Sequence, residues 1–187
     1  MVRVQLHSGV RPGEVCRLRA DEIEVIAEDL WVWRPKAHKA AWRGHARQVF
    51  LGPKAIALLT PRLEAARGGY LFSPARAREE RFAAMRAARK TRVQPSQRCR
   101  KKSSPKKAPG ERYRRDSYAQ AITRACKRAG VAPWHPNQLR HLAATTLVAR
   151  YGWETARVYL GHRSVNTTRV YAEDDLARVA EAAREVG

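Results

Sequence analysis

Cysteine is scarce in this sequence, and its spacing does not fit the usual metal sites. The three cysteines, Cys16, Cys99 and Cys126, lie far apart, and none belongs to a Cys-x-x-Cys pair. Their odd number and wide separation are unlike a disulfide-stapled secreted domain, so we expect reduced thiols in the cytosol. No cluster of His, Cys and Asp has the spacing of metal ligands, and we expect no metal and no other cofactor.

Long apolar runs, lipidation motifs, a signal peptide and internal repeats are also missing from the sequence. Without an apolar stretch of about 20 residues, a membrane location explains the sequence poorly. We therefore expect a cytoplasmic protein, in the bacterial cytosol or nucleoid. The chain opens directly into "VRVQLHSG", which is typical of the middle of a domain, and we expect a fragment or a short reading frame that lacks a preceding domain.

Acidic residues are few relative to basic ones. The 187 residues contain 17 Asp and Glu against 38 Lys and Arg, which gives a formal net charge of +21. Such an excess indicates a polyanionic partner, and nucleic acid is the leading candidate. A ribosomal or structural RNA-binding role stays open on charge alone. The length and the 44% hydrophobic content fit one domain with a real core.

The hydrophobic patterns predict a mainly helical α+β domain with a small antiparallel sheet. Its three strands are predicted at 22–27, 30–34 and 47–51, where β-rich runs are separated by polar, turn-like stretches. Residues 68–74 predict a buried connector.

Helices are expected over most of the remaining chain. Their predicted ranges are 11–19, 52–59, 116–129, 137–152, 153–161, 164–171 and 173–187. Pro61 is expected to end or kink the second of these helices, and Asp116 to cap the third. Gly130, Gly152 and Gly161 are expected to stop helices.

The last predicted helix, 173–187, has acidic residues in its first turn and an apolar stripe along one face. The stripe consists of Leu176, Val179, Ala180, Ala183 and Val186. A stripe of this kind needs a partner surface, in the same chain or in another one. Self-association through the C-terminal helix is therefore one of our expectations.

Residues 76–115 differ from the rest in composition. The segment contains sixteen basic residues and three acidic ones, so it carries well over half of the net charge. We expect a solvated, mobile loop that becomes ordered on a phosphate backbone. The residues expected to bind DNA there are Arg98, Arg100, Lys101, Lys102, Lys106 and Lys107.

Five short stretches occur in an order that suggests phosphoryl-transfer chemistry. They are "SGVRPGE" (8–14), "HKAAWRGHARQVFLGP" (38–53), "NQLRH" (137–141), "LGH" (160–162) and a tyrosine, Tyr171, nine residues after His162. A lone tyrosine usually belongs to a core or an interface. Transfer of a phosphodiester to tyrosine needs guanidiniums on the phosphate, a proton donor for the leaving oxygen and help in deprotonating the phenol.

These stretches resemble the catalytic domain of the tyrosine recombinases, also called phage-type integrases. That family has Thr/Ser-Gly-x-Arg-x-x-Glu, a hairpin lysine, His-x-x-Arg-His, Leu-Gly-His and a nucleophilic tyrosine nine residues after the last His. The resemblance covers nearly the whole chain, which we expect to be one catalytic domain over 1–187, with the basic insert at 76–115. We expect the family's N-terminal DNA-clamping domain to be absent, because the sequence before the first motif has no room for it.

The resemblance implies a role for each matching residue. Tyr171 matches the nucleophile, and Arg11 and Arg140 match the pair that clamps the phosphate. Lys39 matches the hairpin lysine that acts as the acid for the 5′ leaving oxygen. His162 matches the histidine that hydrogen-bonds the phosphate region.

Supporting residues match as well, with one departure. Glu14 matches the acid that supports the first arginine, and His141 matches a structural histidine after the second. The family has His, or sometimes Lys, three residues before Arg140, whereas this chain has Asn137. Asparagine can donate a hydrogen bond but cannot shuttle a proton. Asn137 can also be a helix N-cap, and His135 is a possible substitute for the missing base.

The sequence thus predicts site-specific DNA recombination or integration, by strand cleavage and rejoining through a 3′-phosphotyrosine, with double-stranded DNA as partner. Two alternatives stay open. The first is a type IB topoisomerase-like activity with the same chemistry and no strand exchange. The second is a non-catalytic DNA-binding remnant of an integrase, which Asn137 and the lack of a clamping domain favour.

Overall fold

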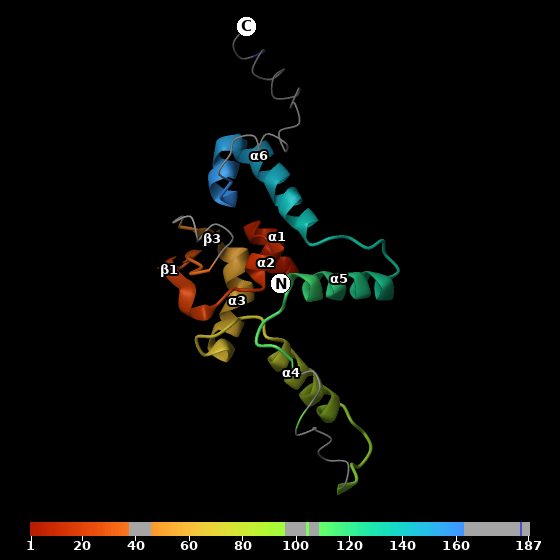
Figure 1. Cartoon of the computed structure of the whole chain (residues 1–187). Helices are drawn as coiled ribbons and strands as arrows, with labels where there is room; N and C mark the ends of the chain where they lie inside the picture. The colour runs from red at the N-terminus through yellow and green to blue at the C-terminus, as the bar shows by residue number, and fades with distance from the viewer. Residues whose placement is uncertain (38–45, 96–103, 105–108, 163–183, 185–187) are drawn as a thin grey trace.

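The structure is a computed structural model, which describes residues 1–37, 46–95, 104, 109–162 and 184 (Figure 1). In chain order the elements are α1 (Val2–Ser8), α2 (Pro12–Val15), a 3-10 turn η1 (Ala20–Glu22), β1 (Ile23–Ala27), β2 (Leu30–Trp33), β3 (Val49–Leu51), α3 (Pro53–Ala66), α4 (Pro74–Ala87), α5 (Arg115–Ala129) and α6 (Asn137–Leu160). The mainly helical α+β prediction is confirmed. No helix in these described ranges is both long and apolar enough to cross a bilayer.

The three predicted strands form one antiparallel sheet in the order β1-β2-β3. Trp33 of the central strand faces Ile23 on one side and Val49 on the other. Trp33 is fully buried, whereas Val25 in the edge strand β1 is 63% exposed. The sheet therefore contributes to the core mainly through β2 and β3, and β3 leads directly into α3.

Helix α1 lies at the centre of the molecule, although the sequence did not predict it. The buried amide of Gln5 donates to the carbonyls of Val10 (3.1 Å) and Pro136 (3.0 Å) and accepts from the hydroxyl of Tyr118 (2.9 Å). A buried amide with all these partners is satisfied and specifies one arrangement. Gln5 thereby fixes the segment before Arg11 against the segment that begins α6.

Two helix predictions were wrong in detail. Pro61 lies inside α3, which continues to Ala66, so it does not end the helix. Asp116 lies in the first turn of α5 instead of at its cap, and Arg114 is the N-cap residue. The predicted stops hold: Gly130 and Gly161 adopt left-handed C-cap conformations, and Gly152 interrupts α6 with φ 80° and ψ 164°.

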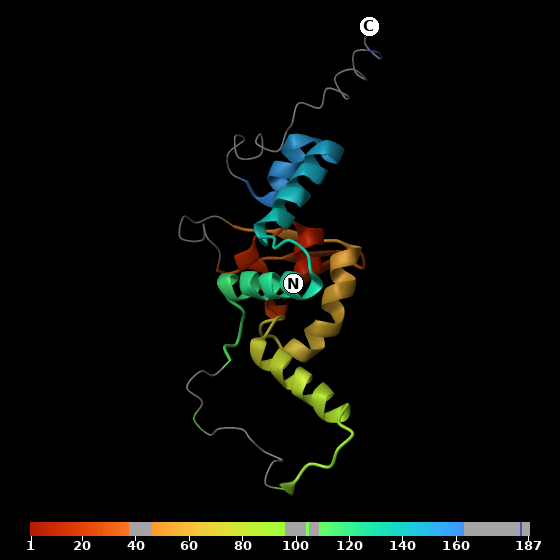
Figure 2. The ribbon, with the colours of Figure 1, turned by 90° about the vertical axis from the view of Figure 1, so that its right-hand side faces the viewer.

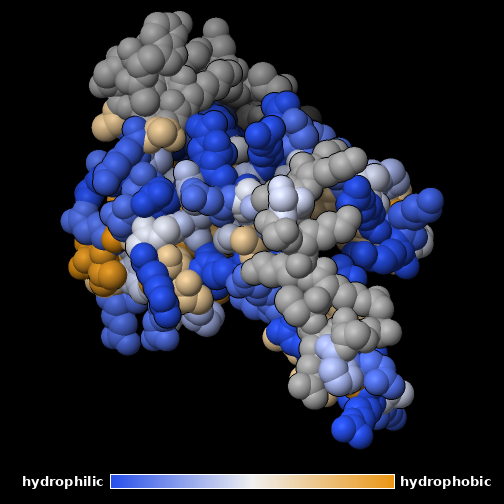
Figure 3. All heavy atoms as spheres, turned by 60° about the horizontal axis from the view of Figure 1, so that its bottom comes forward, coloured by the Kyte–Doolittle hydropathy of each residue, from blue (hydrophilic) through white to orange (hydrophobic). Residues whose placement is uncertain are grey.

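The basic segment is not a loop throughout. Its first part forms α4, which begins with Ser73 as N-cap and Pro74 in the first turn and has no buried residue. Both ribbon views show α4 projecting from the body at the end opposite to α6 (Figures 1 and 2). Hydrophilic side chains dominate the face seen from this end (Figure 3). The expectation of a loop was wrong for α4, because alanine, arginine and glutamate favour a helix once it is capped.

Candidate active site

Arg11 stands at the N-terminus of the short helix α2. Pro12 occupies the first turn, where its fixed φ and missing N–H are tolerated. The Glu14 carboxylate accepts the backbone N–H of Arg11 and its guanidinium Nη1, both at 2.9 Å. Glu14 is almost buried, while the Arg11 side chain is 36% exposed. The pair leaves the Arg11 guanidinium oriented and accessible to an anion.

Arg140 connects two backbone turns from opposite ends of the chain. Its Nη1 donates to the carbonyl of Gly9 at 2.7 Å, and its Nη2 donates to the carbonyl of Leu160 at 2.8 Å. The side chain is only 5% exposed. Gly9 has φ 60°, and an added Cβ would lie 2.7 Å from Leu160 Cδ2, so the two turns pack closely. Arg140 thus holds the end of α1, two residues before Arg11, beside the end of α6.

His162 follows the left-handed Gly161 at the end of α6. Its backbone N–H donates to the carbonyl of Arg157 at 2.9 Å, which closes the helix. Burial, followed by the positive charges of Arg140, Arg11 and Arg47, lowers the pKa of His162 to about 4. The imidazole is therefore neutral at pH 7 and can offer a hydrogen bond without adding charge.

The predicted residues therefore meet at one place. Arg11, Glu14, Arg140 and His162 come from the two ends of the chain, and the turns that carry them are joined by hydrogen bonds. Arg47 joins this group, and the sequence did not single it out. Burial opposes the ionisation of Glu14, yet Arg47 and Arg11 outweigh it and hold its pKa below the ordinary value. Three guanidiniums act on the imidazole of His162, and only the Glu14 carboxylate offsets two of them, so the site has excess positive charge, which suits a phosphate.

Asn137 is the first residue of α6 and does not cap it, because Pro136 occupies the N-cap position. The N-cap interpretation of Asn137 is therefore wrong. Its side-chain amide lies 2.8 Å from His141 Nε2, and its backbone N–H donates to His135 Nδ1 at 3.3 Å. His135 and His141 are exposed. The two histidines therefore flank Asn137 at the solvent-facing start of the helix.

Other predicted site residues lie outside the described ranges. They are the acid Lys39, the nucleophile Tyr171 and the DNA-binding group Arg98, Arg100, Lys101, Lys102, Lys106 and Lys107. The predicted helices at 164–171 and 173–187 fall outside as well, apart from Arg184. These assignments stay predictions.

Metal chemistry finds no obvious place in the described part of the chain, where no three His, Cys, Asp or Glu side chains are grouped to hold an ion. Cys16 and Cys126 are free thiols in the core, and burial raises the pKa of Cys16 to about 11. Such a thiol is a poor nucleophile at neutral pH.

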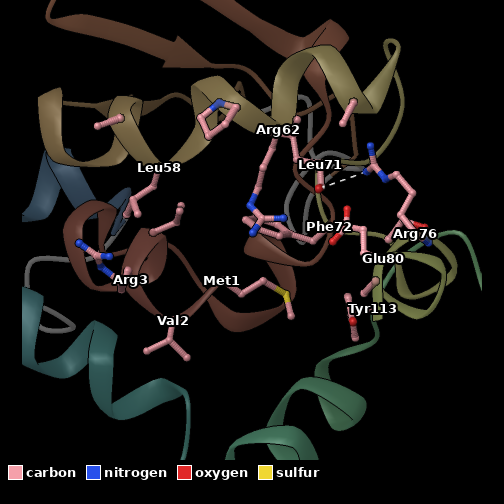
Figure 4. A pocket seen from close by; sticks show the side chains of 16 residues that line it. Met1, Val2, Arg3, Leu58, Arg62, Leu71, Phe72, Arg76, Glu80 and Tyr113 are labelled. Carbon is pink, nitrogen blue, oxygen red and sulfur yellow. Dashed lines mark hydrogen bonds between the residues drawn. The ribbon is translucent and has the colours of Figure 1, made fainter. Parts of the chain in front are cut away.

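A cavity of about 840 Å³ lies away from the arginine cluster, between α1, α3 and α4. Met1, Leu58 and Phe72 line it together with the charged Arg62, Arg76 and Glu80 (Figure 4). Arg76 is held there by the carbonyls of Tyr70 and Leu71. None of the predicted site residues contributes to this cavity.

Residues 1–178 match the phage integrase family. The chain belongs to that family. The match confirms the resemblance drawn from the five motifs, and no curated protein matches the chain.

Solved structures of two recombinases and a transposon integrase share the fold of this chain. The XerH site-specific recombinase bound to difH substrate is 22% identical, with a TM-score of 0.60, over 97% of this chain and 44% of that one. The XerA recombinase is 21% identical, with a TM-score of 0.60, over 100% and 55%. The Tn1549 transposon integrase in complex with transposon right end DNA is 13% identical, with a TM-score of 0.61, over 98% and 56%. The chain spans about half the length of these proteins.

Asn137 gives a prediction that separates a hydrogen-bond donor from a proton shuttle. Asn137→Ala should slow DNA cleavage by about tenfold, the value of one neutral hydrogen bond near 1.4 kcal/mol. Asn137→His should keep or raise the rate, because imidazole can both donate and shuttle. Single-turnover cleavage measures both, with Thr145→Ala, exposed on the same helix, as the control. If His135 is the base, His135→Ala should be the damaging change and Asn137→His should partly restore it. Unchanged cleavage in all these variants contradicts both roles.

Proposed function

We propose that this chain is a catalytic domain for site-specific DNA recombination or integration, which cuts and rejoins duplex DNA through a 3′-phosphotyrosine. The observation that carries the proposal is the cluster of Arg11, Arg140 and His162, assembled from distant segments, in which the two arginines act on the imidazole. The family match over 1–178 supports it.

In this proposal the oxygen of Tyr171 attacks the scissile phosphorus while the bond to the 5′ oxygen breaks. Arg11 and Arg140 offset the charge that builds on the nonbridging oxygens, and neutral His162 donates one hydrogen bond. Lys39 gives its proton to the leaving 5′ oxygen. The phenolic proton passes to water or to His135, because Asn137 has no site that can accept and release it. Attack by a 5′-hydroxyl reverses the step without metal or ATP.

The two alternatives have less support. The structural relatives are recombinases and an integrase, so a topoisomerase-like activity without strand exchange is not favoured. A DNA-binding remnant would not need the Glu14–Arg11 pair, which holds a partly exposed guanidinium in one orientation. We further propose action on DNA in the bacterial cytosol or nucleoid, and self-association through the C-terminal helix 173–187.

Trapping on a nicked suicide duplex tests the proposed function. Such a substrate loses its 5′-hydroxyl strand by diffusion after cleavage, so a covalent protein–DNA adduct accumulates. We expect a denaturant-stable adduct whose linkage maps to a 3′-phosphate. Integrase-type attachment sites and random duplex should be compared, since a preference for one site favours a recombinase over a topoisomerase. Tight binding without adduct on any duplex would favour the remnant.

The basic segment gives a second prediction, for affinity. Replacing residues 86–108 with a neutral Gly/Ser linker of equal length should weaken duplex binding and flatten its dependence on salt. The slope of log K against log salt should fall by about 0.9 for each phosphate that the protein no longer neutralises. Binding titrations at several salt concentrations measure both quantities. A linker with the same basic residues in shuffled order should retain most of the affinity, because charge and not sequence binds the backbone. An unchanged slope in the neutral variant contradicts the role.

A further inference from the structure

Arg47 is a buried cation that the mechanism above does not use. It lies two residues before β3, and its side chain is 7% exposed. Its Nη1 donates to the Gln48 carbonyl at 3.0 Å, and its Nε lies 3.5 Å from Glu14 Oε1. Among the described residues, the buried Nε and Nη2 have no hydrogen-bond partner. A buried guanidinium is costly to keep in this state unless it serves a purpose there.

The guanidinium of Arg47 also packs against the turn that carries His162. A Cβ added to Gly161 would lie 3.0 Å from Arg47 Cζ, and Gly161 has φ 65°. Any side chain at position 161 would therefore be strained and would collide with Arg47. The guanidinium of Arg47 therefore lies close to both Gly161 and Glu14. These two residues belong to segments almost 150 residues apart.

From this packing we propose that Arg47 is a positioning residue for DNA cleavage, which holds the Glu14–Arg11 pair and the Gly161–His162 turn in one arrangement. The inference rests on the proposed function. The contacts of Arg47 are with Glu14, the Gln48 carbonyl and the Gly161 turn, so it acts through the residues that it packs against. A misplacement of about 1 Å at a phosphoryl-transfer site can cost a hundredfold in rate, which is the scale on which such a support matters.

The positive charge of Arg47 should have a measurable effect on the pKa of His162. Arg11 at the N-cap of α2, Arg47 before β3 and Arg140 of α6 act on this imidazole. Arg157 of α6 donates to the backbone carbonyl of His162, and Glu14 lies beside Arg11 and Arg47. Arg47 is one of the three cations that lower the pKa of His162. Removing it should raise that pKa, whereas a residue that only fills space in the core would leave the titration unchanged.

The test compares Arg47→Met, Arg47→Lys and Arg124→Met in the full chain. Arg124 is exposed on α5, so its substitution removes the same charge away from the site. We expect Arg47→Met to bind duplex as Arg124→Met does and to form adduct ten- to a hundredfold more slowly. Its His162 should titrate at a pKa higher by roughly 0.5 or more, measured by NMR of the imidazole. Arg47→Lys should keep the titration of His162 and lose part of the rate.

Each outcome decides whether Arg47 is a positioning residue or only fills space in the core. Arg47→Met that cleaves at the rate of Arg124→Met overturns the proposal. If Arg47→Met does not fold, Arg47→Lys decides, and a wild-type rate with lysine overturns the positioning role. If wild-type protein forms no adduct at all, the proposed function fails by itself. The titration of His162 then judges Arg47 alone, and an unchanged pKa in the methionine variant rejects the assignment.

Discussion

Tyr171→Phe is expected to abolish the covalent protein–DNA adduct while duplex binding stays at the wild-type level. Phenylalanine keeps the ring and removes only the oxygen that would attack phosphorus, so the loss should be at least about a thousandfold. Tyr171 follows His162 by nine residues, and His162 lies at the arginine cluster. Adduct yield on the suicide duplex, resolved by denaturing gel, measures the effect.

A second tyrosine provides the control for this experiment. Tyr151 lies on α6 and is 55% exposed, with Arg150 over its ring. Tyr151→Phe should leave the adduct yield within about twofold, because an exposed hydroxyl contributes little. A normal yield from Tyr171→Phe would assign the nucleophile elsewhere. Peptide mapping of the wild-type adduct would then identify the tyrosine that carries the DNA.

Much of the fold could be predicted from local patterns. The three strands were visible because apolar and β-branched residues cluster in short runs between polar turns. Gly130, Gly152 and Gly161 were visible as helix stops because each adopts a positive φ, which other residues rarely do. These signals act over a few residues, which is why a single sequence reveals them.

Other features depend on contacts across the chain and gave no local signal. Gln5 looks like any polar residue of a short helix, yet it binds Tyr118 and Pro136, which lie 113 and 131 residues away. Arg47 could not be distinguished among 38 Lys and Arg, because only packing against Gly161 and Glu14 buries it. Pro61 was predicted to end or kink its helix, yet α3 continues past it to Ala66, although proline usually breaks a helix interior.

Helix α4 was not predicted from the sequence because its segment is strongly basic. The four basic residues inside it, and the basic residues that follow it, favoured the interpretation as a solvated loop, although Ser73 and Pro74 formed a recognisable helix start. The motifs of the candidate site were easier to find than this helix. Their residue types and spacing point to the chemistry directly, whereas the shape of the basic insert depends on a weak balance of propensities.

Arg140→Lys and Arg140→Ala should lose both cleavage and stability. Lysine presents a single ammonium and cannot reach the carbonyls of Gly9 and Leu160 in the fork that the guanidinium makes. Alanine leaves both buried carbonyls without these donors. Each bond to a charged donor contributes about 1.5–3 kcal/mol, so the alanine variant should lose roughly 3–5 kcal/mol of unfolding free energy. In a chain of this size that lowers the melting temperature by roughly 6–20 °C.

The activity loss should exceed what instability explains. Cleavage should fall at least about a thousandfold at a temperature where thermal melts show the lysine variant to be folded, because a transition-state guanidinium and the support of Arg11 are both lost. Arg150→Lys, exposed on the same helix, should cleave at the wild-type rate.

A substrate with sulfur in place of the 5′ bridging oxygen should rescue Lys39→Ala, since a thiolate leaves without a proton donor. That substrate should not rescue Arg140→Lys, because the charge on the nonbridging oxygens still needs a partner. Rescue of both variants would assign Arg140 to leaving-group protonation, and a lysine variant that cleaves within tenfold of wild type would remove it from the phosphate site.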